Sequence, residues 1–348
     1  MPKPRSVTLQ TIADECGVSR TTVSNAFSRP DQLSDELRSR VLHTADRLGY
    51  TGPHPGARSL RKGRAGALGV VLKESLAYAL NDSHAIEFLG GLAESTQDPP
   101  MALALIPAGP IDSGTTSAIA DALVDGFCLF SLPDGHPAIE SALARRLPTV
   151  FVDGPRLPDH SFVGIDDTAA MREMTEAIIN AGHHDIVALT FRLLPDDYIG
   201  PVDDERIDRT AFAVTRNRLR GFTNAVQARS LTPRIYEVGV NTRLAAKSAA
   251  SQVLCSSSPP TALVCVSDEI ALGALEAARE IGLDVPKHLT VTGFDDIPEA
   301  AQANLATVRQ SAAEKGRVAA RLATTDTTET VILPHEFVAR RSLGPPPS

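Results

Sequence analysis

A short polar face near the N-terminus carries residue types that can read DNA bases. Arg20, Thr21 and Asn25 fall on one side of a predicted helix, whereas Val23 and Ala26 fall on the other side. Arginine pairs with O6 and N7 of guanine, asparagine pairs with N6 and N7 of adenine, and threonine contacts a thymine methyl group or a phosphate. The face therefore predicts contact with base edges in the major groove.

Two helices joined by a tight turn are needed to hold this face. The first has apolar residues at the spacing of one helical stripe, namely Leu9, Ile12, Ala13 and Cys16. Gly17 suits a sharp reversal, Ser19 is a natural N-cap for the second helix, and a third helix opens at Ser34. This pattern predicts a helix-turn-helix domain over residues 1–49. The alternative is three amphipathic helices used only for packing or dimerisation.

The charge is distributed unevenly along the chain. Residues 1–64 contain 11 Lys/Arg against 6 Asp/Glu, which leaves 23 against 36 in the remainder of the 34 and 42 present. The head thus carries a formal charge of +5 and the rest a charge of −13. A basic end on an acidic body indicates that this end contacts phosphates.

Length and composition favour an ordinary globular protein of two or three compact units. The chain has 348 residues, of which 43% are hydrophobic and 22% charged, so it can bury a sizeable core. The four cysteines are scattered without a CxxC pair, as is typical of reduced thiols in the cytoplasm. We expect neither a signal peptide nor a membrane span.

Residues 50–64 have the composition of a hinge. Gly and Pro residues at 52, 53, 55 and 56 disfavour a stable helix in the free chain. The basic stretch ARSLRKGR follows, is compatible with a helix and carries one exposed leucine. Such a segment can fold when it packs against a partner or DNA. The alternative is a plain flexible linker.

The body, residues 65–348, alternates apolar strand-like runs with amphipathic helical stretches. Short buried strands followed by helices predict parallel sheets covered on both faces. The number of runs favours two doubly wound α/β lobes, with ligands bound at the carboxyl ends of the strands. The predicted strands span 67–72, 101–106, 126–130, 149–152, 185–190, 261–267 and 289–294.

Polar residues at these strand ends are candidates for ligand binding. Ser75, Asp153 and Asp268 follow predicted strands, Asn241 lies at a probable helix start, and Arg218 lies in the stretch NRLRGF. Carboxylates, an amide and a guanidinium suit a hydroxyl-rich ligand such as a sugar. Helix capping or a salt bridge is the structural alternative for each of them.

The head and hinge resemble the lactose-repressor (LacI) family of bacterial regulators. The resemblance runs from VTLQTIADECGVSRTTVSNAF through ARSLRKGR and onward over almost the whole chain. It implies base readers at Arg20, Thr21 and Asn25, with a leucine wedge in the minor groove at Leu60. The residues implied to contact DNA are Thr8, Ser19, Arg20, Thr21, Thr22, Ser24, Asn25, Ala57, Arg58, Leu60 and Arg61.

The body resembles the family's periplasmic-binding-protein-like domain in VFVDGP, RLRGF and LTVTGFDDIPEA. The resemblance implies a first lobe over about 65–163 and 296–322, and a second lobe over 164–295 and 323–348. The segment 192–215 is longer than usual and could reshape the pocket mouth. The implied effector-binding residues are Ser75, Tyr78, Asp153, Arg218, Asn241 and Asp268.

The expected function is a dimeric, sequence-specific transcriptional regulator, most simply a repressor on a palindromic operator, controlled by a sugar or related metabolite. The alternative is a solute-binding protein with the same two-lobed body. We expect no enzyme activity, cofactor or metal site. The adjacent His183 and His184 do not share a face as metal ligands would, and the sequence has no GxSxG, P-loop, HExxH or GxGxxG motif.

Overall fold

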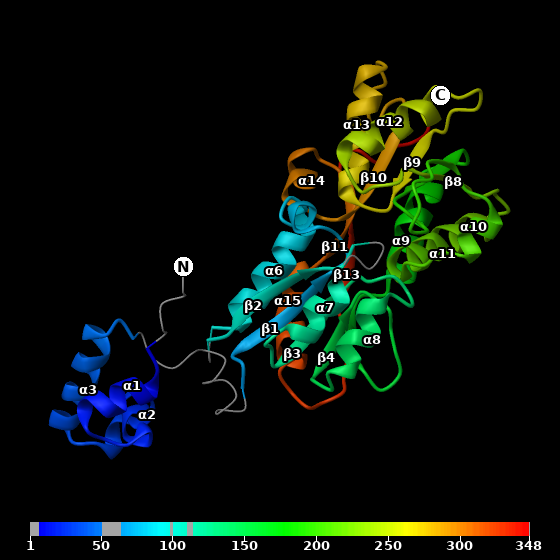
Figure 1. The fold of residues 1–348 in the computed structure, drawn as a ribbon. Helices are drawn as coiled ribbons and strands as arrows, with labels where there is room; N and C mark the ends of the chain where they lie inside the picture. The colour runs from blue at the N-terminus through cyan, green and yellow to red at the C-terminus, as the bar shows by residue number, and fades with distance from the viewer. Residues whose placement is uncertain (1–6, 51–63, 98–99, 110–113, 348) are drawn as a thin grey trace. The chain divides into compact units, whose positions relative to one another are not determined.

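The computed structural model describes residues 7–50, 64–97, 100–109 and 114–347. The chain divides into two compact units, Met1–Gly66 and Ala67–Ser348 (Figure 1). The predicted DNA contacts of the hinge, Ala57, Arg58, Leu60 and Arg61, lie outside the described residues. None of the described helices is long and apolar enough to cross a membrane.

The first unit contains the predicted helices, α1 (Leu9–Cys16), α2 (Arg20–Ser28) and α3 (Asp35–Arg47), with a short 3-10 turn at Pro30–Gln32. Gly17 ends α1 with φ 64°, and its N–H donates to carbonyls of the last turn. Ser19 and Ser34 cap α2 and α3 by accepting from the N–H groups of Thr22 and Leu37. The caps predicted from the sequence are therefore confirmed.

A small apolar core joins the three helices. Its fully buried members come from all three, namely Ile12, Ala13, Val23, Ala26, Val41 and Ala45. The rings of Phe27 and Tyr50 meet edge to face, with centroids 5.7 Å apart, at the rim of this core. The core uses one face of α2 and leaves its other face available to a partner.

The second unit is built on two sheets. All neighbouring strands of the first sheet are parallel. Their spatial order is β12 (Thr330–Ile332), β5 (Ser161–Gly164), β4 (Thr149–Val152), β3 (Gly126–Phe130), β1 (Ala67–Leu72) and β2 (Ala102–Pro107).

Helices cover both faces of this first sheet because its side chains alternate between the faces. Leu68, Val70 and Leu72 of β1 pack with α6 (Ser83–Ser95) and α15 (Ala312–Leu322). Val71 packs instead with α7 (Thr115–Asp121) and α8 (Pro137–Ala144). The short helix α5 (Leu76–Ala79) lies between β1 and α6 along the chain.

The second sheet is parallel except at its two edges, where β13 and β7 run antiparallel to their neighbours. Its order is β13 (His335–Val338), β11 (Ala306–Gln310), β10 (Thr290–Asp295), β9 (Ala262–Cys265), β6 (Ile186–Thr190), β8 (Arg234–Glu237) and β7 (Gly200–Pro201). The accompanying helices are α9 (Asp167–Asn180), α10 (Asp204–Asp208), α11 (Ala213–Gln227), α12 (Arg243–Leu254), α13 (Asp268–Glu280) and α14 (Pro298–Gln302). The predicted fold class, a helical head followed along the chain by two doubly wound α/β lobes, is confirmed.

Two of the expected crossings between the lobes are wrong. The second was expected near residue 296, but β11 pairs with β10, so the chain leaves the second sheet only after Gln310. The third was expected near residue 322, but β12 pairs with β5 of the first sheet. The chain therefore returns to the second lobe between Ile332 and His335, where β13 joins β11. The crossing expected near residue 163 falls where β5 ends at Gly164.

Candidate functional site

The predicted reading face lies at the N-terminal end of α2. Arg20 and Thr21 are exposed, while Thr22 and Ser24 are half-buried. The first turn of α2 contains no acidic residue, so no negative charge there opposes the approach of a phosphate. Asn25 is half-buried, and its Nδ2 atom donates to Gln32 Oε1 at 3.3 Å. The face can thus present a guanidinium, a hydroxyl and an amide to one groove.

Thr8 and Ser19 each cap the start of a helix in the first unit. The hydroxyl of Thr8 forms a capping box with Thr11 at the start of α1. The Ser19 hydroxyl caps α2 and lies 2.9 Å from the Thr22 hydroxyl. A DNA contact by either residue would add to these roles, because both residues are exposed.

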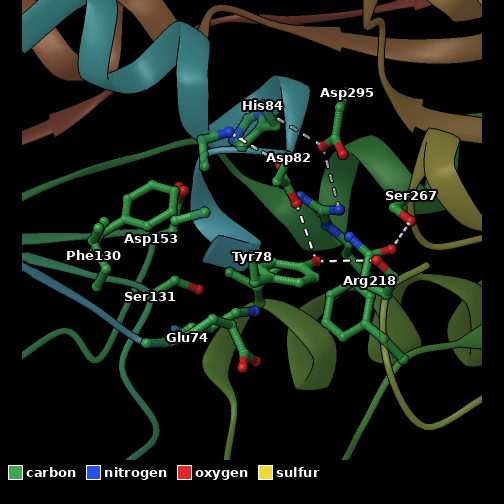
Figure 2. A pocket seen from close by; sticks show the side chains of 17 residues that line it. Glu74, Tyr78, Asp82, His84, Phe130, Ser131, Asp153, Arg218, Ser267 and Asp295 are labelled. Carbon is green, nitrogen blue, oxygen red and sulfur yellow. Dashed lines mark hydrogen bonds and ion pairs between the residues drawn. The ribbon is translucent and has the colours of Figure 1, made fainter. Parts of the chain in front are cut away.

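A cavity of about 650 Å³, its open mouth included, lies between the two lobes. Part of its lining, including Glu74, Asp153, Phe191 and Asp295, ends or follows strands of both sheets at their carboxyl ends, where open α/β sheets bind ligands. Figure 2 shows the side chains around it. Its lining comprises Leu72, Lys73, Glu74, Tyr78, Ala79, Asp82, His84, Ala85, Phe130, Ser131, Asp153, Phe191, Val214, Arg218, Asn241, Ser267 and Asp295.

Tyr78 joins the lobes across this cavity. Its hydroxyl lies 3.1 Å from Asp82 Oδ2 of the first lobe and 3.0 Å from the Asn241 carbonyl oxygen of the second (Figure 2). Burial, followed by the neighbouring Asp82, raises the pKa of Tyr78 above its ordinary value, so the phenol keeps its proton. The single phenol proton is therefore shared between two acceptors. A ligand hydroxyl could donate to either acceptor in place of Tyr78.

Arg218 of α11 is a buried cation that the second lobe contributes to the cavity lining. Its Nε atom donates to Asp167 Oδ1 at 2.9 Å, and its guanidinium lies 3.6 Å above the ring of Phe294. Burial opposes its charge, but Asp167 and Asp295 raise the pKa of Arg218. Asp295 Oδ1 is 3.6 Å from Arg218 Nη1 and accepts from Gln310 Nε2 at 2.6 Å. The guanidinium is thus fixed in one orientation beside the cavity.

Asp153 presents its carboxylate from the first lobe. It follows β4 in a left-handed conformation with φ 62°, which aspartate tolerates better than most residues. Its Oδ1 atom accepts from the fully buried Lys315 at 2.5 Å, and Lys315 also donates to Gln310 Oε1 at 2.5 Å. Asp153 is therefore both a wall of the cavity and part of a buried ion pair.

The structure brings together four of the six predicted effector residues, Tyr78, Asp153, Arg218 and Asn241. Ser75 is not in the lining, since its hydroxyl caps α5 by accepting from the Tyr78 N–H. Asp268 is also outside the lining. It is fully buried and accepts from Thr307 Oγ1 at 2.6 Å and from the Ile297 N–H at 2.9 Å.

Two polar residues that line the cavity were not predicted from the sequence. Ser267, one residue before Asp268, lines the cavity and donates to Asn241 Oδ1 at 2.5 Å. Asp295 at the end of β10 also lines the cavity and was not among the predicted residues. The signal for Asp295 was present, because it ends a predicted strand in the same way as Asp153 does. Glu74 and Phe191 also line the cavity and come shortly after the predicted strands 67–72 and 185–190, whereas His84 follows no strand-end signal.

A helix-turn-helix head with a polar recognition face, followed by two lobes around a polar cleft, defines the class of ligand-regulated DNA-binding proteins. Residues 8–52 match the family model for bacterial regulatory proteins of the lacI family, and residues 175–343 match a periplasmic binding protein-like domain. The sequence is 42% identical over 356 residues to the HTH-type transcriptional regulator Rv3575c of Mycobacterium tuberculosis, covering 99% of both chains. The chain belongs to the LacI family of transcriptional regulators.

Other relatives agree with this assignment. The HTH-type transcriptional regulator IpsA of Corynebacterium glutamicum is 39% identical over 317 residues, covering 89% of this chain and 88% of that protein. A crystal structure of a LacI-family regulator from Corynebacterium glutamicum superposes with a TM-score of 0.74 at 33% identity, covering 98% of this chain and all of the other. The lac repressor dimer bound to operator and the anti-inducer ONPF has the same fold, with a TM-score of 0.74 at 22% identity and coverage of 98% and 100%.

Proposed function

We propose that this regulator is a repressor that binds a palindromic operator as a homodimer and is controlled by an uncharged, hydroxyl-rich ligand in the cleft. The observation that carries the ligand proposal is the convergence of Tyr78, Asp153, Arg218 and Asn241 from both lobes on one cavity. These groups offer the paired donors and acceptors that hydroxyl groups need. A neighbour of the same fold, the regulator CelR, has been solved with cellobiose, which supports a carbohydrate-like ligand.

On the DNA, Arg20, Thr21 and Asn25 would read base edges, while Thr8, Ser19, Thr22 and Ser24 would contact phosphates. The hinge residues Ala57, Arg58, Leu60 and Arg61 would enter the minor groove, with Leu60 as the wedge. A dimer doubles this contact and explains why operators of such proteins are symmetric. Action on chromosomal DNA places the protein in the cytoplasm.

In the cleft, Ser267 and Asp295 replace Ser75 and Asp268 in the proposed contact set. Ligand hydroxyls would compete for Asp82 and the Asn241 carbonyl oxygen, the two acceptors of the Tyr78 hydroxyl. This competition would change the free-energy difference between the open and the closed arrangement of the lobes. The first lobe follows the hinge directly along the chain, so its movement can alter how two hinges are held in a dimer.

The test starts by selecting operators from a random DNA pool with the full-length chain. Anisotropy titrations then measure how candidate polyols change operator affinity. We expect one polyol to change the affinity of the wild-type protein but not that of the Arg218→Ala variant, whose operator binding without ligand stays intact. A variant that still responds to that polyol would place the ligand elsewhere, and failure to select any DNA would refute the repressor role.

A further inference from the structure

The segment 191–216, here called the strap, is firmly attached to the second lobe. Its anchor is Glu237 of β8, a carboxylate with no exposed surface. Glu237 accepts from the Leu193 N–H at 2.9 Å and from Arg206 Nε at 2.6 Å. Arg206 also donates to both oxygens of Asp196, at 2.9 and 2.7 Å. These contacts hold the strap as a defined structure rather than a loose loop.

The strap also bonds to the first lobe at two places. Arg192 forms an ion pair with Glu74, which lines the cavity. Further along, the Asp134 N–H donates to the Ala211 carbonyl oxygen at 2.8 Å, and Arg216 Nη1 donates to Asp134 Oδ2 at 2.7 Å. The strap therefore spans the gap between the lobes beside the cavity.

Two aromatic residues of the strap face a lysine of the first lobe. The Nζ atom of Lys73 lies 5.0 Å from the ring centre of Phe191 and 5.6 Å from that of Phe212. Burial lowers the pKa of Lys73, as expected for an amine that the two rings shield from water. The strap thus supplies an apolar wall as well as polar bridges.

The acids around the cavity already have donors among the described residues. Glu74 pairs with Arg192, Asp153 pairs with Lys315, and Asp295 receives Gln310 and faces Arg218. A cationic ligand would have to displace the donors of these partly buried pairs, which leaves an unpaired charge behind. An anionic ligand would face these carboxylates, and burial lowers the pKa of Lys73, the lining amine that no ion pair holds among the described residues. Hydroxyl groups can instead donate to the remaining lone pairs without displacing any cation.

We propose that the strap restricts the effector to an uncharged polyol of single-ring size, which the closed cleft encloses whole. A longer ligand would extend between the lobes and would have to break the bonds at Glu74 or Asp134, or the contact between Tyr78 and Asn241. The strap is therefore a specificity element of the cleft. This inference rests on the proposed effector function of the cavity.

Calorimetric titration of the full-length chain tests the ligand class with matched probes. The probes are aldopentoses, aldohexoses and cyclitols, together with the phosphate ester and a disaccharide of each compound that binds. We expect at least one single-ring polyol to bind, and its phosphate ester and disaccharide to bind at least a hundredfold more weakly. A phosphate ester or disaccharide that binds as tightly as its parent, or no binding by any single-ring polyol, would overturn the proposal.

The double variant Arg192→Ala/Arg216→Ala tests the strap itself. We expect it to bind the disaccharide at least tenfold more tightly than the wild type does, with little change for the single-ring parent. Arg209→Ala is the matched control, since this exposed strap arginine pairs only with Glu205 among the contacts described. If circular dichroism shows that the double variant is unfolded, Glu74→Gln removes one bridge from the first lobe instead.

An unchanged preference in a folded strap variant would remove the strap from the mechanism. The operator selection described above is independent of these titrations. A chain that binds its operator but no single-ring polyol would therefore refute the ligand class alone, whereas a chain that selects no DNA would refute the repressor function.

Discussion

Lys315 forms an ion pair with Asp153, in which the Nζ and Oδ1 atoms are 2.5 Å apart. Lys315 is completely buried on α15, and Asp153 is 8% exposed and lines the cavity. The same ammonium group donates to Gln310, the last residue of β11 before the chain crosses between the lobes. Lys315 thus connects a carboxylate that lines the cavity to a segment at which the chain crosses between the lobes.

Lys315→Met is expected to lower the free energy of unfolding by about 3–5 kcal/mol, because it leaves the buried Asp153 carboxylate without its cation. Adding Asp153→Asn should recover at least half of this loss, since the charge that lacks a partner is then removed. Urea denaturation of both single variants and the double variant measures the coupling.

The control is Arg172→Ala, which removes an exposed pair with Glu176 and should cost about 1 kcal/mol or less. Strictly additive effects of Lys315→Met and Asp153→Asn would show that the pair does not contribute as a unit.

Adjacent glycines on α6 should respond in opposite directions to the same substitution. A Cβ atom at Gly91 would lie 1.9 Å from the Ala313 carbonyl oxygen of α15, whereas nothing lies within 4 Å of one at Gly90. Gly91→Ala must push the two helices apart and should cost about 1–3 kcal/mol or more. Gly90→Ala should stabilise the protein by about 0.5–1 kcal/mol, because alanine favours a helix.

Thermal unfolding of both variants, with their circular dichroism spectra, measures the difference. Equal shifts in melting temperature would mean that α6 and α15 do not require close contact at Gly91.

Local signals made the head predictable, because each cap and stripe lies within a few residues of the helix it defines. Ser19 and Ser34 cap helices in the structure as the sequence indicated. All seven predicted strand runs contain strands. The strands β5, β7, β8, β11, β12 and β13 were missed, since none of them is longer than five residues and most mix polar with apolar residues.

The crossings between lobes could not be predicted, because they depend on which distant strand each segment pairs with. Thr330 pairs with Phe162, which lies 168 residues earlier in the chain, and no local pattern encodes that choice. The orientation of single side chains in the cleft could not be predicted from the sequence either. Ser267 and Asp268 are neighbours, yet the cap geometry of α13 turns the first toward the cavity and buries the second.

Asp268 should make stability depend on pH. Burial, followed by the nearby Asp295, raises the pKa of Asp268 well above its usual value of about 4. The folded state then binds more protons than the unfolded state between the two pKa values, so stability should fall as pH rises through that interval. Asp268→Asn removes this proton linkage, so the denaturation midpoint should decline less between about pH 4 and pH 7. An unchanged slope would show that Asp268 is ionised in the folded protein throughout.

The cysteines should differ sharply in reactivity. Cys128 and Cys265 are buried, and burial raises the pKa of both thiols above their usual range, so little thiolate forms. Cys255 is exposed. Iodoacetamide at pH 8 should modify Cys255 within minutes and leave Cys128 and Cys265 untouched until a denaturant is added. Mass spectrometry of peptides reads each site, and Cys255→Ser is the control that should abolish the fast reaction. Early modification of Cys128 would show that the first lobe opens in the native state.

Arg20→Ala tests the reading face of α2. Arg20 is exposed at the first position of the helix, where its guanidinium can form two bonds to a guanine. The substitution should cost about 1–3 kcal/mol on the selected operator and relax the preference at one base pair per half-site.

Arg47→Ala is the matched control. Its side chain pairs with Glu15 of α1 within the same unit, so the loss should weaken binding little and leave base preference unchanged. Anisotropy titrations on the operator, on single-base variants and on random DNA separate the two effects. If Arg20→Ala weakens binding equally on all of these DNAs, Arg20 contacts phosphate and does not read a base.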